Sequence, residues 1–405
     1  MSKKVKLSEI ANIKMGQSPS GDTCNDIGNG IALLNGPAEF TSYYPVPKQY
    51  TIDGKRFSDK GEILFCVRGS TTGRMNWGDQ KYALGRGLAS ISHKNGNEYN
   101  HFLKFLLQSN LKSLLNAANG STFPNLTSDI LASFELNVPE EKTQKTISFF
   151  LQSIDSKIEL NNRINSELEA MAKTLYDYWF VQFDFPHKNG KPYKTSGGTL
   201  VWSEKLKREI PEGWEVKKIG KILKTSLGGT PSTKVKEYWE NGKISWLNSG
   251  EIANFPIIDS ELKITEAAIK NSATDLLPKG SVMLSITRHL RPSILGISAC
   301  ANQSVIGILE KDDIKCYFLY PYLQNEIPRL MEMRSGAQQP HINKEIVDES
   351  FILLPNNETE LLKKYNAHAG HFYESIINNA FQNQKLTELR DWLLPMLMNG
   401  QVKVN

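Results

Sequence analysis

The sequence predicts an α+β protein with two similar globular units and two long antiparallel coiled-coil helices, arranged as a pseudo-two-fold internal repeat. Three observations support this fold class. Segments of the first half recur in the same order about 216 to 218 residues later, two long stretches carry the spacing of a coiled coil, and short apolar strand patterns fill the regions between them. At 405 residues the chain is long enough for two or three domains, each with its own core.

The composition is that of an ordinary globular protein, with 40% hydrophobic and 22% charged residues. No apolar run reaches the roughly 18 residues of a membrane span, and the basic N-terminus lacks the apolar segment of a secretory signal. The four cysteines form no CxxC pair, so we expect no metal site and a reduced, cytoplasmic protein. The net charge of +5 is compatible with nucleic acid but mild.

Three pairs of segments define the repeat of the globular units. VKLSEIANIKMGQSPSG resembles WEVKKIGKILKTSLGGTPST, and KGEILFCVRGS resembles KGSVMLSITRH. NGSTFPNLTSDILASFELNVP resembles SGAQQPHINKEIVDESFILLP, which places Pro124 opposite Pro340 and Pro139 opposite Pro355. Alternating runs such as EILFCVRG and SVMLSITR predict strands, so each unit is expected to be mixed α+β.

The helices repeat as well, and both carry asparagines in the middle of an apolar seam. Shifting the first seam by 218 residues reproduces Asn161 and Asn165 as Asn379 and Asn383. In an antiparallel pair Asn161 would face Asn383 and Asn165 would face Asn379, and a buried amide layer would penalise a slip in register. The alternative is that these amides lie at the solvent-exposed edge of the seam. The first seam consists of Ile147, Leu151, Ile154, Ile158, Asn161, Asn165, Leu168, Ala172, Leu175 and Trp179.

This pattern divides the chain into globular unit, helix, globular unit and helix, with a Pro/Gly-rich linker after the first helix. The linker region is locally basic, with ten Lys or Arg against four Glu between residues 188 and 224. The expected boundaries are 1–145 for the first unit, 146–185 for the first helix, 186–210 for the linker, 211–356 for the second unit and 357–405 for the second helix.

The order and double occurrence of these segments resemble the specificity subunit of type I restriction–modification systems. The turns GQSPSG and GGTPS, the segment FCVRGSTTGR and the helix ends AKTLYDYWFVQFDFP and LRDWLLPMLMNGQV carry the likeness. The resemblance implies two target recognition domains that read an asymmetric bipartite DNA site across a gap measured by the helices. It also implies docking of two modification subunits, which bind S-adenosylmethionine and methylate adenine, and the joining of restriction subunits that cleave.

The resemblance further implies that this chain has no catalytic residues and no cofactor of its own. The sequence agrees, since it contains no GxxxxGK[ST], [DN]PP[YF] or HExxH motif. Two alternatives belong to other functional classes. One is a stand-alone regulator with tandem DNA-binding units, which would bind DNA tightly without partners, and the other is an enzyme such as a fused methyltransferase, which the missing motifs argue against.

DNA contacts are expected from polar and basic side chains on loops, because these match base edges and phosphates. Arg86 aligns with Gln303, and since Arg prefers guanine and Gln prefers adenine, equivalent loops could read different bases. In the first unit the candidates are Ser18, Ser20, Arg68, Thr71, Arg74, Lys81, Arg86, Ser121 and Thr122. In the second unit they are Thr230, Ser232, Lys234, Lys236, Arg288, His289, Arg291, Gln303, Gln338 and Gln339.

Large side chains at the two helix ends are candidates for docking the modification subunits, since such anchors suit protein interfaces. The alternative is that they complete the cores of the globular units. The candidates are Tyr176, Tyr178, Trp179 and Phe180 in the first helix and Trp392, Leu393, Met396 and Leu397 in the second.

Overall fold

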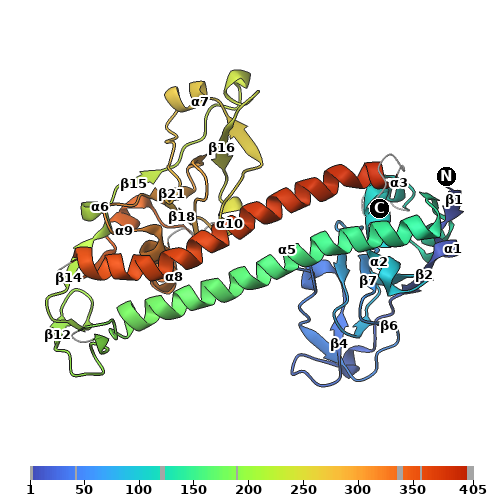
Figure 1. Cartoon of the computed structure of the whole chain (residues 1–405), viewed down its shortest axis with the longest axis horizontal. Coiled ribbons are helices and arrows are strands. Elements are labelled where there is room, and N and C mark those ends of the chain that lie inside the picture. The colour runs from blue at the N-terminus through green and yellow to red at the C-terminus, as the bar shows by residue number, and fades with distance from the viewer. Residues whose placement is uncertain are drawn as a thin grey trace. The chain divides into compact units, whose positions relative to one another are not determined.

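A computed structural model describes residues 3–41, 43–118, 124–187, 190–334, 341–355 and 358–398. The chain divides into two compact units, Met1–Leu160 together with Asn383–Asn405, and Asn161–Gln382. Two continuous helices, α5 (Glu141–Tyr176) and α10 (Glu358–Met398), each contribute to both units (Figure 1). Within the described ranges no helix combines the length and apolar character needed to cross a membrane.

The first unit is built on a four-stranded antiparallel sheet in the order β2-β10-β7-β8. A second sheet has the order β3-β5-β4-β9-β6, with β4 and β9 parallel, and β1 pairs with β11. The strands are β1 (Lys3–Lys6), β2 (Ala11–Met15), β3 (Cys24–Asn25), β4 (Ile31–Leu34), β5 (Gln49–Thr51), β6 (Phe57–Ser58), β7 (Ile63–Cys66), β8 (Met75–Trp77), β9 (Tyr82–Leu84), β10 (Leu88–His93) and β11 (Glu135–Val138). The short helices are α1 (Leu7–Ile10), α2 (Asn100–Ser109), α3 (Leu111–Asn116) and α4 (Ser128–Ser133).

The second unit has the same plan. Its four-stranded antiparallel sheet has the order β15-β21-β18-β19, a further sheet has the order β17-β16-β20 with β16 and β20 parallel, and β14 pairs with β22. The strands are β14 (Glu215–Lys218), β15 (Thr225–Leu227), β16 (Ile244–Leu247), β17 (Leu262–Ile264), β18 (Val282–Ser285), β19 (Arg291–Ile294), β20 (Ala299–Ala301), β21 (Val305–Ile308) and β22 (Phe351–Leu354). The short helices are α6 (Ile219–Ile222), α7 (Glu266–Lys270), α8 (Cys316–Glu332) and α9 (Lys344–Asp348).

The common strand order confirms the expected repeat and the α+β class. The helix after the central sheet begins NHFLKFLL in α2 and CYFLYPYL in α8, with its apolar residues buried in both. The short helix before the last strand is capped in both units by a side-chain oxygen, from Thr127 in α4 and Asn343 in α9. Equivalent local sequences therefore form equivalent elements.

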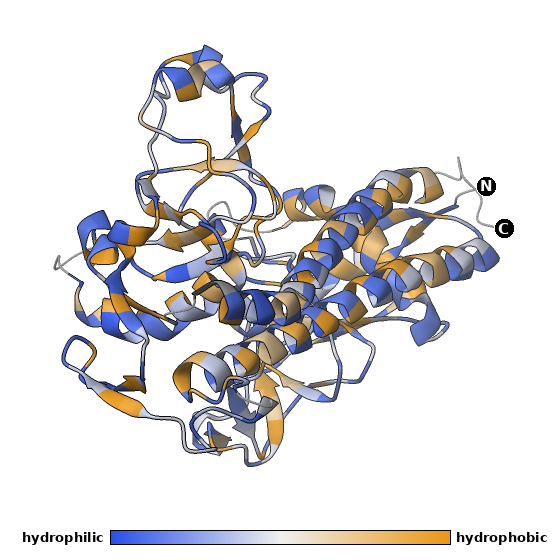
Figure 2. Cartoon of the chain, turned by 60° about the vertical axis from the view of Figure 1, so that its left-hand side comes forward, coloured by the Kyte–Doolittle hydropathy of each residue, from blue (hydrophilic) through white to orange (hydrophobic). Residues whose placement is uncertain are grey.

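Each unit completes its core with residues of both long helices. In the first unit Ile147 and Leu151 of α5 share a buried cluster with Leu394 and Leu397 of α10. In the second unit the end of α5 and the start of α10 enter the cluster that also holds the sheet. Hydrophobic and hydrophilic residues alternate along both helices, as expected for helices with one face in a core and one in solvent (Figure 2).

Within the second unit, side-chain amides of α5 and α10 form hydrogen bonds between the two helices. Asn379 donates a hydrogen bond from Nδ2 to Asn165 Oδ1 at 2.8 Å, and Asn161 donates from Nδ2 to Gln382 Oε1 at 2.7 Å. Partner numbers on α10 fall as those on α5 rise, so the pairing is antiparallel. Asn161 is buried, whereas Asn165 and Asn379 are half-buried. The facing of Asn161 and Asn383 stays a prediction.

At the equivalent point of each unit, where α2 or α8 meets the long helices, the chemistry differs. In the first unit Arg390 Nη1 lies 3.1 Å from the buried Asp155 carboxylate, and His101 Nδ1 lies 3.7 Å from it. Lys104 lies over the Trp77 ring at 4.7 Å. The repeat therefore preserves the position of this contact but not its side chains.

The second unit fills the same place with aromatic rings. Tyr317 and Tyr373 stack with ring centroids 5.6 Å apart, and Phe255 stacks on Tyr320 at 4.4 Å. Tyr320 donates its hydroxyl to Glu169 of α5 at 2.7 Å. Both arrangements attach the long helices to the unit, by charge in one case and by ring packing in the other.

The segment expected as a linker, 186–210, is folded into the second unit. Strands β12 (Leu200–Ser203) and β13 (Arg208–Pro211) form an antiparallel hairpin. Before the hairpin, Phe185 stacks on Tyr193 with centroids 4.7 Å apart, and both side chains are buried. Tyr193 of this segment therefore belongs to the core of the second unit, although the segment is rich in glycine and proline.

Candidate nucleic-acid interface

The four-stranded sheet of the first unit gathers most of the nominated side chains at one end. Its register pairs Leu88 with Cys66 and Ala89 with Met15, so the ends of β2 and β7 meet the start of β10. Strand β8 begins beside the end of β7. The turns that follow β2, β7 and β9 consequently lie together at this end, which we call the reading end of the unit.

The second unit repeats this arrangement. Ser285, the last residue of β18, pairs with both Val305 of β21 and Arg291 of β19, and Leu227 of β15 pairs with Ile306. The turns after β15, β18 and β20 therefore share one end of the sheet, the reading end of the second unit. The same strand order thus brings together, in each unit, candidate residues that are far apart in the sequence.

A hydrogen-bonded junction fixes the first reading end. Gly16 donates from its backbone N–H to Leu88 O, and the Arg86 N–H donates to Ser18 Oγ at 3.2 Å. A Cβ on Gly16 would lie 2.2 Å from Gly85 O, so only glycine fits this close approach. The GQSPSG turn is therefore built to hold Ser18 against the turn that carries Arg86, whose side chain is exposed.

The second reading end has the same junction. Gly228 donates to Val305 O at 3.0 Å, and Gly229 donates to Ala301 O at 2.8 Å. The Thr230 hydroxyl donates to Gln303 Oε1 at 2.5 Å. The bond fixes the amide plane of Gln303, an exposed side chain at the position that Arg86 occupies in the first unit.

The turn between β7 and β8 carries the first unit's other basic candidates. Arg68 donates from Nε to Asn125 Oδ1 at 3.1 Å, and Arg74 reaches Pro37 O with Nη1 at 3.5 Å. Both guanidinium groups are exposed, whereas Thr71 is half-buried beside Cys66 Sγ at 3.8 Å. Arg68 and Arg74 keep free donors for a phosphate or a base, and Thr71 is better placed to shape the turn.

The corresponding turn of the second unit exposes Arg288, His289 and Arg291. Ser285 tightens it by donating to His289 O and accepting from the Arg291 N–H. Arg334 at the end of α8 donates to Arg288 O at 3.3 Å, so it adds a cation that the sequence reasoning missed. Its position after a helix gave no signal, because only the fold brings it to this turn.

The remaining loop candidates differ in their position. Ser20 and Ser232 are exposed, and their carbonyl oxygens accept from Thr23 Oγ1 and Trp239 Nε1. Lys234 and Lys236 are exposed in the loop that continues from Thr230. Ser121, Thr122, Gln338 and Gln339 lie outside the described residues.

Lys81 is not brought to the reading end, because it precedes β9 whereas Arg86 follows that strand. Its ammonium group lies 4.7 Å from the centroid of the Phe57 ring. It borders a surface pocket of about 590 Å³ that is also lined by Lys14, Lys55 and Arg56. The structure therefore assigns Lys81 to a different basic surface from the other candidates.

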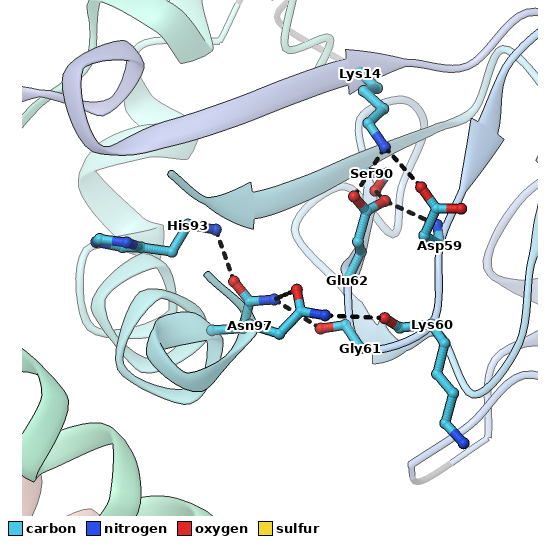
Figure 3. Close-up of polar contacts among 9 residues, drawn as sticks. Lys14, Asp59, Lys60, Gly61, Glu62, Ser90, His93 and Asn97 are labelled. Carbon is cyan, nitrogen blue, oxygen red and sulfur yellow. Dashed lines mark hydrogen bonds and ion pairs between the residues drawn. The ribbon is translucent and has the colours of Figure 1, made fainter. Parts of the chain in front are cut away.

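Within that basic surface Lys14 is already neutralised (Figure 3). Its Nζ lies 2.8 Å from Glu62 Oε1 and 3.3 Å from Asp59 Oδ2, and Ser90 donates to the other oxygen of Glu62. Burial lowers the pKa of Lys14, but the two carboxylates outweigh it and leave that pKa raised. This ion pair ties β2 to the start of β7, so Lys14 serves the sheet rather than a ligand.

Two exposed amides beside Arg86 were also missed. Asn35 packs against Gly85, whose added Cβ would lie 2.7 Å from Asn35 Oδ1, and donates from Nδ2 to Gln49 Oε1 at 2.7 Å. The sequence could have supplied their residue types, which suit base edges. It gave no sign of their position, which depends on the parallel pairing of β4 with β9.

The docking candidates separate into buried and exposed groups. Tyr176, Trp179 and Phe180 are buried in the core of the second unit, as in the alternative that they complete that core, and their docking role stays a prediction. Tyr178 is 38% exposed. An aromatic-rich helix end has the same pattern whether it faces a core or a partner, and here Phe318 of α8 and Tyr365 of α10 pack against it.

The α10 candidates divide in the same way. Leu397 is buried in the first unit, and Leu393 packs on that core, so both agree with the alternative that these side chains complete a core. Trp392 is 66% exposed, and Met396 is half-buried. Among the described residues no group of three or more His, Cys, Asp or Glu could hold a metal ion.

The chain matches known proteins over nearly its whole length. The family described as "Type I restriction modification DNA specificity domain" matches residues 2–170 and 211–390, one copy for each repeat. The type I restriction enzyme MjaIX specificity subunit of Methanocaldococcus jannaschii is 27% identical, over 98% of this chain and 93% of that protein. The HindI specificity subunit of Haemophilus influenzae is 24% identical, over 86% and 88%.

The fold is also found in a solved structure. The crystal structure of a type I restriction–modification system S subunit from M. genitalium superposes with a TM-score of 0.60. The alignment covers 98% of this chain and 96% of that one at 16% identity, so it compares the folds alone.

Proposed function

This chain belongs to the family of type I restriction–modification DNA specificity subunits, and from that premise we propose that each unit reads one part of a bipartite DNA site with its reading end. The observation that carries the proposal is the repeated junction. The same hydrogen-bonded turns present Arg86 in one unit and Gln303 in the other. Two domains that recognise different DNA sequences require the same backbone arrangement with different side chains at its exposed turns.

The two tips predict different bases. A guanidinium donates two hydrogen bonds to guanine O6 and N7, whereas a glutamine amide matches adenine N6 and N7. Arg68 and Arg74 supply positive charge next to Arg86, and Arg288, Arg291 and Arg334 supply it near Gln303. We therefore expect an asymmetric site, with guanine in the part read by the first unit and adenine in the part read by the second.

The long helices would set the gap between the two parts. Helices of 36 and 41 residues extend about 54 and 62 Å at 1.5 Å per residue. This is more than one turn of DNA, about 34–36 Å. The hydrogen bond between Asn165 and Asn379 supports a fixed register, because a slip would leave half-buried amides without partners.

Modification subunits would dock on apolar side chains that the long helices expose. In the first unit these are Phe149 and Leu160 of α5 and Leu389 and Trp392 of α10. In the second unit Ile164 and Met171 of α5 and Tyr178, just after α5, are exposed. One patch for each unit supports two partners for each chain, and large apolar anchors suit protein interfaces.

The reaction would then be divided among the subunits. The specificity subunit is the non-catalytic member of the complex and would recognise the DNA sequence. The modification subunits would bring S-adenosylmethionine and methylate adenine, and restriction subunits would join them to cleave, with the assembly acting on DNA in the cytoplasm. The modest net charge of +5 predicts weak DNA binding by this chain alone, with much of the phosphate contact coming from its partners.

The test is co-expression with the modification subunit encoded nearest to it, followed by co-purification and sequencing of methylated bases. A split motif with methylated adenine, lost when this chain is omitted, is the expected result. A continuous motif, or methylation that persists without this chain, would refute the proposal.

A further inference from the structure

An apolar pocket of about 300 Å³ opens beside the reading end of the second unit. It begins at Thr230, the residue that holds Gln303; Trp239, Trp246 and Leu262 supply its apolar lining, and Thr233, Lys236 and Glu240 border it. Leu262 is 45% exposed, so part of this lining is hydrocarbon in contact with water. The function proposed above uses the polar tip of this surface but leaves the pocket without a role.

The two tryptophans present only hydrocarbon to the pocket's occupant. Trp246 donates its indole N–H to Gly229 O at 3.0 Å, and Trp239 donates its own to Ser232 O at 3.2 Å. The rings meet edge to face, with centroids 5.1 Å apart. Both donors are therefore used to hold the turn that carries Thr230, so neither indole needs a polar group from a ligand.

The first unit lacks this pair of rings. In β4, Leu33 pairs with Ala83 of the parallel strand β9, one step before Leu34 and Leu84. In β16 the position equivalent to Leu33 is occupied by Trp246, which pairs with Cys300 of the parallel strand β20. The tryptophan is thus a feature of the second unit alone, and it should affect only the bases that this unit reads.

We propose that this pocket receives the 5-methyl group of a thymine next to the base read by Gln303. In the major groove the thymine methyl is the apolar feature of the base edges, and protein contacts to it are apolar. A pocket that adjoins a base-reading amide and is lined by Trp239, Trp246 and Leu262 offers hydrocarbon to that edge. Gln303 and the pocket would then specify neighbouring base pairs, one through hydrogen bonds and one through hydrocarbon.

The inference rests on the function proposed above, and deoxyuridine tests it because this base lacks only the methyl group. The experiment uses the complex of this chain with its modification subunits. The DNA duplexes contain the motif identified by sequencing methylated bases. Each thymine in the part read by the second unit is replaced in turn by deoxyuridine. Binding is measured by fluorescence anisotropy at one salt concentration. At one position we expect about threefold to fivefold weaker binding, the effect of losing one buried methyl.

A matched pair of variants locates the effect. Leu262→Ser removes exposed hydrocarbon from the pocket, and Leu276→Ser makes the same change at a leucine of this unit that is 47% exposed and outside it. In Leu262→Ser the thymine and deoxyuridine duplexes should bind equally, whereas Leu276→Ser should keep the wild-type preference. Both side chains are largely on the surface, so both variants should fold.

Three results would overturn the inference: no deoxyuridine position that weakens binding, a loss of equal size in Leu262→Ser, or no thymine in this part of the motif. Tighter binding to a mismatch at the sensitive position would overturn it too, because it would indicate an extruded base. In each case a split, methylated motif would still be recovered. Absence of the motif itself would instead refute the function proposed above.

Discussion

Replacing Arg390 with methionine should weaken the first unit at a largely buried ion pair. The Asp155 side chain is 4% exposed, and Arg390 Nη1 lies 3.1 Å from its Oδ1. The pKa of Asp155 is lowered although burial raises it, because His101, Lys104 and Arg390 favour the carboxylate. Removing Arg390 leaves that charge with poorer partners.

The expected loss follows from this geometry. Breaking a buried pair by removing one partner costs about 3–5 kcal/mol. His101 stays within 3.7 Å of Asp155, and Lys104 also attracts it, so we expect the lower end of the range, about 3 kcal/mol. Asp155→Asn should cost a similar amount, whereas the double variant should cost less than the sum of the two singles.

Hydrogen exchange of the α2 amides is the assay, because α2 carries His101 and Lys104. A loss of about 3 kcal/mol should lower their protection about a hundredfold. Lys364→Met removes the exposed ion pair with Glu360 and serves as the control, with an expected effect below about 0.5 kcal/mol. Equal effects of Arg390→Met and Lys364→Met, or additive costs in the double variant, would refute the reasoning.

Three further outcomes follow from the same contacts. Arg86→Gln should change guanine toward adenine at one position in one part of the methylated motif, and changes in both parts would contradict separate reading. Asn379→Leu removes the donor to Asn165 and should cost about 1–2 kcal/mol in calorimetric unfolding, while replacing both by leucine should be less harmful than either single change; additive losses would contradict a paired amide layer. Burial lowers the pKa of Lys104 to about 8 from 10.5, so the unfolded chain binds more protons at this residue and the Lys104 contribution to stability should rise as pH increases from about 8 to 10.5, whereas tyrosines whose pKa is raised by burial contribute in the opposite sense near pH 10. Lys104→Met should flatten that rise in a pH series of denaturant melts, and an unchanged slope would exclude Lys104 as its source.

The repeat and the fold class could be predicted because strand and turn patterns are local. The glycines at 16 and 228 appear in the sequence as turns, and the structure adds that each passes within contact of a neighbouring backbone. Arg86 and Gln303 were found by aligning the two halves, which worked because both follow equivalent strands. The local sequence pattern therefore predicted the position of a candidate residue wherever that residue lies in the turn next to a predicted strand.

The failures involve contacts between distant segments. Asp155 and Arg390 are 235 residues apart, and neither the pair nor its aromatic counterpart in the second unit follows from helical periodicity. The interior positions of Tyr176 and Trp179 depend on packing against Phe318 of α8 and Tyr365 of α10, which lie far away in the sequence. Side-chain type suggests the chemistry of each candidate, but the fold determines which side chains meet.

Exchange of one unit tests the central claim most directly. Residues 211–355 are replaced by the corresponding segment of a relative with a different motif, the hybrid is co-expressed with the modification subunit, and methylated bases are sequenced. The hybrid should keep one part of the original motif and the gap length while acquiring the other part from the relative. A motif altered in both parts, or an unchanged motif, would contradict two separate readers joined by a fixed spacer.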